Sequence, residues 1–281
     1  MIDLHVHSYV SDGTSSPKEI IKMAYEKKLK AVALTDHDSI EGIKEAESEA
    51  LKLNVNFIKG IEISTAYKSG RLLHILGLGI DTSNTNFLKI YDRMKMAREE
   101  GIGDILEILI KQGVSIDIKD LRKYAVGKYL DRQAIPKYFV KNKICSTVPE
   151  VWHRYLDLIP YAKGELLEAE ETFEIIKGAG GISVLAHFHK NIGMQGYTKD
   201  ETENNIKQLV DLGLQGIEKY YPTYSKSDKE YVDYIIDKYK LIPSGGTDFH
   251  GSNRPEVTLG EGDNGFFVPD NIYENMTKYF N

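Results

Sequence analysis

The chain has 281 residues, of which 41% are hydrophobic and 28% charged, an ordinary composition for a folded globular protein. Its formal net charge of −6 argues against a broad basic surface, so we expect no stable binding of duplex nucleic acid. With one cysteine, no apolar run approaching the roughly 18 residues of a membrane span, and no signal-peptide pattern, we expect a cytoplasmic protein without disulfides that binds no membrane.

The first segment, residues 1–7, alternates apolar and polar positions, which predicts a β-strand. Residues two apart on a strand point to the same face, so His5 and His7 project together. Histidine is the commonest metal ligand, and Asp12 lies in the turn just beyond this pair. A pair of this kind is at least as often two half-exposed surface histidines, so the rest of the sequence has to decide.

Strands and helices then alternate along the chain. Ser16 and Pro17 have the residue types of a helix N-cap and first helical position. Residues 31–35 form an almost continuous apolar run, which is typical of a strand buried on both faces of a parallel sheet. A helix is expected at 40–53, capped by Ser39 and ended by Asn54, followed by strands at 57–64 and 72–80. This alternation predicts an α/β fold with a parallel sheet.

The pattern changes after residue 80. One long helix or two are expected at 87–110, interrupted by Gly101 and Gly103, and three shorter helices follow, with no convincing strand. We therefore expect a helical insertion over residues 81–169 within an α/β domain made of residues 1–80 and 170–281. The three shorter helices are expected at 118–124, 132–141 and 148–155.

The α/β alternation resumes in the last third of the chain. Helices are expected at 169–177, 200–212 and 225–239, alternating with strands at 181–188, 214–221 and 241–249. The tail from residue 260 is expected to cover the sheet and to end in a short helix from residue 271.

Nine side chains of the types that bind metals share one property. Each lies at, or just past, the end of a predicted strand, and the carboxyl ends of parallel strands converge on the face where active sites lie. Six of the eight histidines in the chain are among them, which would be an improbable coincidence if all six were structural. The nine residues are His5, His7, Asp12, His37, Glu62, His74, His187, Asp248 and His250.

Nine ligands are too many for one ion, because a metal such as zinc takes about four ligands in proteins. Two or three divalent ions are therefore expected. A mixture of imidazole and carboxylate ligands favours manganese, with iron or zinc as alternatives, over calcium and magnesium, which prefer oxygen. Metal ions held close together are a known solution for cleaving phosphate esters.

The motifs around these residues, in this order, resemble the PHP (polymerase and histidinol phosphatase) family. They are His5-Val6-His7-Ser8, Asp12-Gly13, Thr35-Asp36-His37-Asp38, Gly60-Ile61-Glu62, His74-Ile75-Leu76-Gly77, Ala186-His187 and Gly246-Thr247-Asp248-Phe249-His250-Gly251. The resemblance implies a distorted seven-stranded β/α (TIM-like) barrel with a trinuclear metal centre.

The same resemblance implies a division of the ligands among three ions. One ion would take His5, His7, Glu62 and Asp248. A second would share Glu62 and add His74 and His187, and the third would take Asp12, His37 and His250.

The helical insertion is similar to that of stand-alone PHP phosphoesterases, through residues 131–134 and 152–156. That branch includes enzymes that remove the 3′-phosphate of nucleoside 3′,5′-bisphosphates and a 5′-to-3′ exoribonuclease acting on short RNA. The resemblance therefore implies a phosphatase or phosphodiesterase that uses metal-activated water on phosphomonoesters or terminal phosphodiesters of nucleotides or short RNA. Three positions, Gln133, Phe188 and Lys219, differ from the branch, and none is an expected ligand.

Several other residues each have two possible roles. Asp36 is expected to orient a ligand or the attacking water, unless it only begins a helix. Arg98, Arg132, Arg154 and Lys190 are candidates for binding phosphate, although each has the alternative of a solvated surface cation. Glu218 could contact a substrate hydroxyl or form an ion pair. Tyr220 and Tyr221 could stack on a base or only pack.

Three alternative functions remain. A histidinol-phosphate phosphatase would share the centre and the reaction but not the substrate. A noncatalytic PHP module supporting a polymerase is disfavoured because every expected ligand position is filled and the chain has no polymerase segment. A binding protein that merely stores metal is the third alternative.

Overall fold

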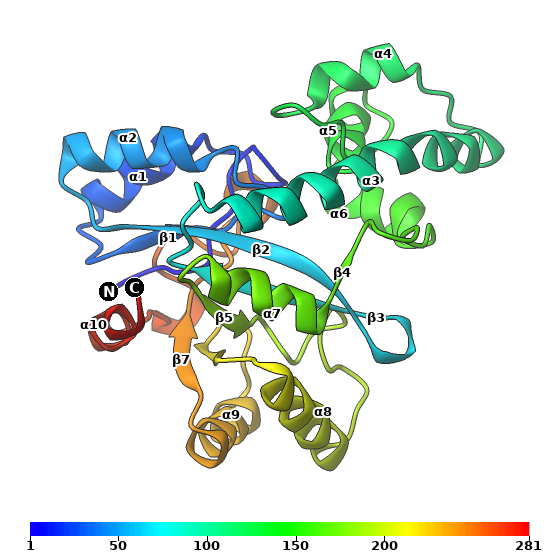
Figure 1. The fold of residues 1–281 in the computed structure, drawn as a ribbon. Helices are drawn as coiled ribbons and strands as arrows, with labels where there is room; N and C mark the ends of the chain where they lie inside the picture. Colours follow the sequence, from blue (N-terminus) through cyan, green and yellow to red (C-terminus); the bar gives the residue numbers. More distant parts are fainter. Residues whose placement is uncertain (281) are drawn as a thin grey trace. The chain divides into compact units, whose positions relative to one another are not determined.

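A seven-stranded sheet organises the first of the two units into which the chain divides (Figure 1). The computed structural model describes residues 1–280. The first unit comprises Met1–Phe87 and the chain from Leu167 onward, and the second is Leu88–Leu166. Within the described residues the strands are β1 (Val32–Leu34), β2 (Phe57–Tyr67), β3 (Arg71–Leu78), β4 (Leu167–Glu168), β5 (Ile182–Leu185), β6 (Gly216–Tyr220) and β7 (Ile242–Gly245).

Neighbouring strands follow the order β1-β2-β3-β5-β6-β7, with β4 beside β2. The N-terminal segment, predicted to be a strand, instead makes isolated bridges: Asp3 pairs with Val32, and Val6 pairs with Phe249. It lies between the two ends of this strand order, because it hydrogen-bonds to the β1 side through Asp3 and to the last residue of β7 through Leu4. The hydrogen-bonded order thus returns to its first strand, as in a distorted β/α barrel.

The prediction of a parallel sheet is wrong at β3. This strand pairs antiparallel with both β2 and β5, while the other strand pairs are parallel. The reason is the connection between β2 and β3, a 3₁₀ turn at Lys68–Gly70, which is far too short for the crossover that parallel neighbours need. As a result the amino-terminal part of β3, which contains His74, lies at the edge of the sheet where its neighbours have their carboxyl ends.

The helices of the first unit begin and end largely where local signals predict. Ser16 and Glu19 form a capping box at the start of α1, and Asn54 ends α2 in the left-handed conformation. Ser39 does not cap α2, which begins at Ile43, because its hydroxyl accepts a hydrogen bond from the backbone two residues on. The helices are α1 (Pro17–Glu26), α2 (Ile43–Leu53), α7 (Ala169–Gly178), α8 (Lys199–Leu212), α9 (Lys226–Tyr239) and α10 (Asp270–Met276).

The second unit, residues 88–166, consists of helices joined by turns and irregular segments, and it contains no strand. The helix α3 (Thr85–Lys111), which enters from the first unit, runs unbroken through Gly101 and Gly103, where an interruption was expected. Gly101 has a packing role, because a Cβ there would lie 2.0 Å from a carboxylate oxygen of Glu165. The other helices are α4 (Ile118–Leu121), α5 (Ala134–Lys141), α6 (Val148–Val151) and a π-helical turn at Trp152–Leu156.

Each unit has its own apolar core. In the first, side chains from the strands pack with the N-terminal segment and α10, which Figure 1 shows beside both chain ends. In the second, residues of α3 and α5 pack around Leu130 and Phe139. Among residues 1–280, none of the helices combines the length and the apolar character needed to cross a membrane.

Candidate metal centre

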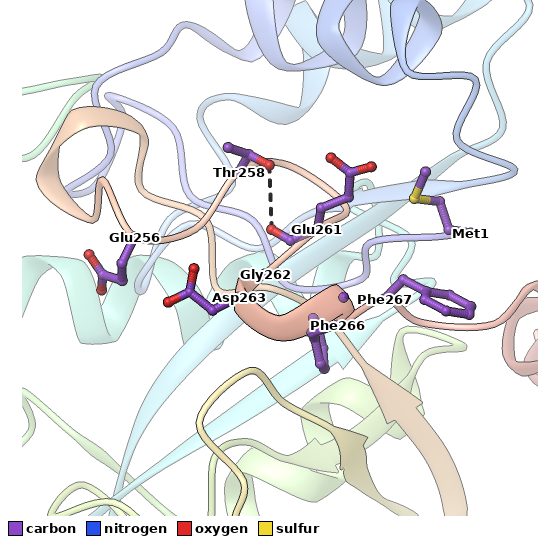
Figure 2. Close-up of a pocket in the computed structure, with 9 residues that line it drawn as sticks. Met1, Glu256, Thr258, Glu261, Gly262, Asp263, Phe266 and Phe267 are labelled. Carbon is purple, nitrogen blue, oxygen red and sulfur yellow. Dashed lines mark hydrogen bonds between the residues drawn. The ribbon is translucent and has the colours of Figure 1, made fainter.

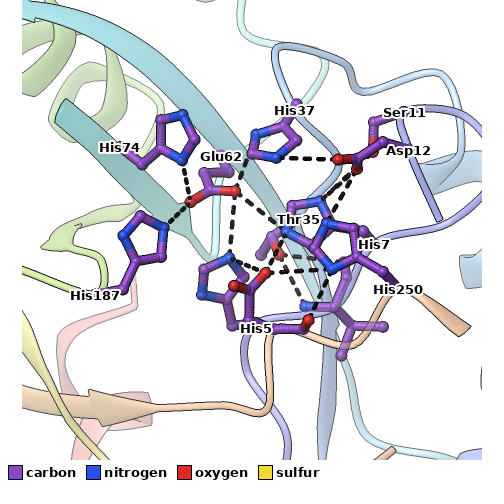
Figure 3. Close-up of polar contacts among 12 residues, drawn as sticks. His5, His7, Ser11, Asp12, Thr35, His37, Glu62, His74, His187 and His250 are labelled. Carbon is purple, nitrogen blue, oxygen red and sulfur yellow. Dashed lines mark hydrogen bonds and ion pairs between the residues drawn. The ribbon is translucent and has the colours of Figure 1, made fainter. Parts of the chain in front are cut away.

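The carboxylate of Glu62, in β2, lies at the centre of a cluster of imidazoles (Figure 3). Its Oε2 atom is 3.2 Å from Nε2 of His5 and 3.2 Å from Nε2 of His7. The same oxygen is 3.0 Å from Nδ1 of His37. The side chains of Glu62, His5 and His7 are fully buried, so one carboxylate oxygen gathers three ring nitrogens away from solvent.

The second oxygen of Glu62 faces two more imidazoles. Its Oε1 atom is 3.0 Å from Nδ1 of His74 and 3.1 Å from Nε2 of His187. His74 lies opposite Ser64 in the β2–β3 pair, and Ser64 shares a face of β2 with Glu62, so antiparallel pairing brings His74 to the same face. Glu62 therefore contacts five of the eight histidines, an arrangement suited to a carboxylate that bridges metal ions.

Two aspartates complete the cluster. Oδ1 of Asp248 is 3.5 Å from Nε2 of His5, 3.3 Å from Nε2 of His7 and 3.4 Å from Nδ1 of His250. Oδ1 of Asp12 is 3.2 Å from Nε2 of His250 and 3.7 Å from Nδ1 of His7. The structure thus brings all nine residues predicted as ligands into one cluster. Their positions differ from the prediction in that Glu62 and His74 lie within strands rather than at strand ends.

The backbone is unusual where two of these side chains enter the cluster. His187 and Asp248, shortly after the ends of β5 and β7, have φ angles of +25° and +55°. Residues other than glycine rarely adopt positive φ, and such conformations concentrate at functional sites. The two turns that direct these side chains into the cluster therefore contain backbone conformations of unfavourable energy.

Gly246 allows the N-terminal segment to approach the end of β7. A Cβ atom at this position would lie 2.5 Å from both the Cβ and the backbone nitrogen of His5. Any larger residue would therefore push His5, and with it the strand-like segment that carries His7, away from the cluster.

The charges of the cluster are strongly coupled. Burial alone would raise the pKa of Glu62, but the neighbouring imidazoles, His74 most of all, hold it well below its ordinary value. The same opposition between burial and imidazole charge holds the pKa values of Asp248 and Asp12 low. Burial dominates at His187 and lowers its pKa to about 4. The carboxylates are thus ionised, and at least one imidazole is neutral, as metal ligation requires.

A buried carboxylate outside the nine orients one of the ligands. Oε1 of Glu218 is 2.9 Å from Nδ1 of His5, and its Oε2 accepts a hydrogen bond of 2.6 Å from the backbone N–H of His187. This contact favours a proton on Nδ1 of His5, so in the neutral imidazole that metal ligation needs, the lone pair of Nε2 would face the cluster. Of the two roles considered for Glu218, a contact with a substrate hydroxyl or an ion pair, the structure shows the ion pair, with His5 as the partner.

Asp36 orders the loop that follows His7. It accepts hydrogen bonds of 2.7 Å from the backbone N–H and from the hydroxyl of Ser8, and another of 2.7 Å from the hydroxyl of Ser11. The Ser11 oxygen in turn lies 3.5 Å from Nδ1 of His7. Because α2 begins only at Ile43, Asp36 does not begin a helix, and its carboxylate accepts the hydroxyl of the serine that lies beside His7.

The cluster fits metal ions. Buried polar atoms normally have hydrogen-bond partners, yet several buried atoms here make no hydrogen bond to any described residue. Ligand atoms also gather in groups of three or four that lie within 4.8 Å of one another, for example His7, Asp12, His37 and His250. The atoms without hydrogen bonds are Nε2 of His5 and His7, Nδ1 of His37 and His74, Oε2 of Glu62 and Oδ1 of Asp12.

Known proteins identify the family to which this cluster belongs. Residues 3–237 match the PHP domain. The chain belongs to the PHP family. A 5′-3′ exoribonuclease from Haemophilus influenzae is 31% identical to this PHP protein over 251 residues, which cover 88% of this chain and 89% of that protein. A 3′,5′-nucleoside bisphosphate phosphatase from Chromobacterium violaceum is 29% identical over 266 residues, which cover 92% and 90% of the two chains.

The PHP fold is also seen in a solved structure of similar extent. A crystal structure of a protein from Bifidobacterium adolescentis superimposes with a TM-score of 0.84, covering 100% of this chain and 96% of that one. At 23% sequence identity this likeness establishes the fold and nothing about substrates. The expected α/β fold of the PHP family, with a seven-stranded sheet, is therefore confirmed.

Three further side chains meet beside the PHP metal centre. Nζ of Lys190, a predicted phosphate contact, lies 3.5 Å from Oδ2 of Asp248. Tyr221 is fully buried and donates its hydroxyl to the same oxygen at 2.6 Å, so it is not an exposed stacking surface. Arg254, which the sequence analysis missed, lies 2.6 Å from this oxygen through Nη1. Its position only four residues after the predicted ligand His250 was the available signal.

The three predicted arginines lie in the second unit. Arg98 and Arg132 are almost fully buried there, both lie over the ring of Tyr161, and both hydrogen-bond to Glu165. Arg154 is half-exposed and pairs at 2.6 Å with the glutamate four residues earlier.

A separate open pocket of about 670 Å³ lies beside the chain's first residue (Figure 2). Three of its lining residues are acidic, and none of the clustered histidines contributes to it. Its negative charge would repel a phosphate ester, so it does not compete with the metal centre as a substrate site. The lining residues are Met1, Glu256, Thr258, Glu261, Gly262, Asp263, Gly265, Phe266 and Phe267.

Proposed function

We propose that this PHP protein is a metal-dependent phosphoesterase that hydrolyses phosphomonoesters or terminal phosphodiesters of nucleotides or short RNA. The observation that carries the proposal is the contact of one buried carboxylate, Glu62, with five imidazoles, because such a hub suits a centre of several metal ions. The names of the two relatives, a nucleoside bisphosphate phosphatase and an exoribonuclease, support this substrate class.

We further propose two or three divalent ions, manganese above iron or zinc, divided among the nine ligands as the family resemblance implies. When bound, such ions would supply an activated water and would neutralise charge on the phosphoryl group. The protein's own part is to keep Glu62, Asp12 and Asp248 ionised and to hold the proton of His5 on Nδ1, facing Glu218. Asp36 acts in this proposal as a positioning residue for His7 through Ser11.

Positively charged side chains are the proposed contacts for the phosphate of the substrate. Lys190 is the first candidate, because its ammonium lies at the edge of the cluster and its side chain is 35% exposed. Arg98, Arg132 and Arg154, in the helical insertion, stay proposed phosphate contacts. The burial of Arg98 and Arg132 favours Arg154 as the more accessible of the three.

The proposal is tested by turnover of a substrate panel by manganese-loaded protein. The panel contains adenosine 3′,5′-bisphosphate, a short 5′-phosphorylated RNA and histidinol phosphate, with p-nitrophenyl phosphate as a general reporter. We expect hydrolysis of one of the first two to exceed that of histidinol phosphate. The opposite preference would assign the alternative substrate, and no hydrolysis of any compound would reject the enzymatic proposal.

Variants connect this activity with the cluster. His5→Ala and Asp248→Ala are expected to abolish turnover while circular dichroism stays unchanged. His153→Ala, a substitution in the second unit outside the cluster, is the matched control and should keep full activity. Retained turnover in either cluster variant would remove that residue from the site.

A further inference from the structure

The two oxygens of Asp248 face different surroundings. Oδ1 faces the imidazoles of the cluster, with His7 at 3.3 Å. Oδ2 accepts hydrogen bonds of 2.6 Å from the hydroxyl of Tyr221 and 2.6 Å from Nη1 of Arg254, and Nζ of Lys190 lies 3.5 Å away. Asp248 thus lies between the predicted metal ligands on one side and two positively charged side chains, Arg254 and Lys190, on the other.

The positive charge beside Oδ2 of Asp248 exceeds the single negative charge of this carboxylate. Arg254 and Lys190 together carry two charges, and Tyr221 already donates to the same oxygen. If Asp248 also ligated a divalent ion, its single negative charge would be shared between the ion and both cations. Two or three divalent ions, together with Arg254 and Lys190, would carry more positive charge than the three ligand carboxylates, Glu62, Asp12 and Asp248, can neutralise. The loaded centre would therefore attract an anion.

The guanidinium of Arg254 has donors to offer such an anion. Its contact with Asp248 uses Nη1 alone, which approaches both Oδ2 and the backbone oxygen, rather than the two-pronged geometry that arginine forms with carboxylates. Its Nε is 3.4 Å from Glu256. The side chain is 16% exposed and that of Lys190 is 35% exposed, so a ligand can reach both.

We propose that Arg254, together with Lys190, binds the non-bridging oxygens of the phosphoryl group that reacts at the metal centre, and that the pair selects a dianionic phosphomonoester over a monoanionic diester. The proposal rests on the phosphoesterase function given above and names its substrate class. Two cations match the double negative charge of a terminal phosphate, and a planar guanidinium matches two of its oxygens.

Binding of inorganic phosphate to the manganese-loaded full-length protein tests this assignment without turnover. We expect Arg254→Met to weaken phosphate binding about 10- to 100-fold, as the loss of a hydrogen-bonded charge does. Arg254→Lys should weaken it less, because lysine keeps the charge but not the planar fork. Lys219→Met is the matched control, since Lys219 pairs with Asp233 instead, and it should bind phosphate as the wild type does.

Manganese affinity, measured on the same variants, distinguishes phosphate binding from a role in orienting Asp248. Tyr221→Phe removes a donor to the same oxygen without removing charge. We expect Arg254→Met to keep its manganese affinity and to bind phosphate more weakly than Tyr221→Phe. Equal losses of manganese affinity in both variants, or wild-type phosphate binding by Arg254→Met, would overturn the assignment. If Arg254→Met does not fold, Arg254→Lys takes its place in the same comparison with Tyr221→Phe and tests the same assignment.

The selection of a monoester is tested by comparing p-nitrophenyl phosphate with bis-p-nitrophenyl phosphate. Arg254→Met should lower kcat/KM for the monoester about 10-fold or more, and should change that for the diester much less. Equal losses on both compounds would overturn the dianion selectivity. If the wild type hydrolyses neither compound nor the substrate panel, the phosphoesterase proposal fails, and the phosphate-binding comparison still decides the role of Arg254.

Discussion

Nδ1 of His5 lies 2.9 Å from Oε1 of Glu218, and both side chains are fully buried. The two residues are 213 positions apart in the chain. Glu218 also accepts the backbone N–H of His187, so one carboxylate holds parts of two predicted ligands. Carboxylates in this position orient metal-binding histidines and set which ring nitrogen carries the proton.

Replacing Glu218 by glutamine should therefore weaken metal binding. The variant keeps the shape of the side chain but loses the charge that holds the proton on Nδ1 of His5, and manganese affinity should fall about 10- to 100-fold. Isothermal titration calorimetry measures this affinity directly. Glu26→Gln, on the exposed end of α1, is the control and should bind manganese normally. Unchanged affinity in Glu218→Gln would show that the carboxylate does not support the ligand.

Asp36→Ala should destabilise the metal-free protein. The substitution leaves the backbone N–H and hydroxyl of Ser8 and the hydroxyl of Ser11 without their buried acceptor. The free energy of unfolding should fall by about 3 kcal/mol, which urea denaturation measures. Ser11→Ala removes only one of these bonds and should cost about 1 kcal/mol. Asp36 would lose its positioning role if the two variants were equally stable.

Gly246→Ala should disturb both stability and the centre. The added methyl group would overlap the backbone nitrogen and Cβ of His5 at 2.5 Å, which should cost roughly 1–3 kcal/mol in unfolding free energy. Displacement of His5 should also lower manganese affinity. Gly103→Ala is the matched control, because a Cβ at this helical position meets no atom within 4 Å. That variant should be neutral or slightly more stable, since alanine favours a helix. Equal stability of the two variants would contradict the close approach at Gly246.

The contribution of His37 to the stability of the metal-free protein should depend on pH. Burial alone would lower the pKa of His37, but the carboxylates of Glu62 and Asp12 raise it from 6.5 to about 10. Because the folded state binds this proton more tightly, the stabilisation is complete below about pH 6.5 and is lost as the pH rises toward 10.

The measurement is the difference in unfolding free energy between the metal-free wild type and His37→Asn, taken across this pH range. The difference should shrink as the pH rises. Added manganese should reverse the trend, because ligation needs a neutral imidazole and so stabilises the wild type more at high pH. A difference that does not change with pH would mean that His37 is not protonated in the folded metal-free protein.

Local patterns in the sequence determined much of this protein. Ser16 and Asn54 mark the ends of helices because capping depends on a few neighbouring residues. The pairing of His5 with His7 follows from the two-residue period of extended chain, and the ordered motifs led to all nine clustered residues. These features need no knowledge of which distant segments meet.

The tertiary structure alone decided how those segments pair. The antiparallel direction of β3, the position of the N-terminal segment between β1 and β7, and the contact of Glu218 with His5 each join residues far apart in the chain. The physical reason is that period and capping encode local conformation, while the partner of a strand or of a buried charge is set by which distant surfaces pack together. Arg254 was missed for a different reason: it is only six residues from Asp248, but its contact with this carboxylate depends on how the turn after β7 folds.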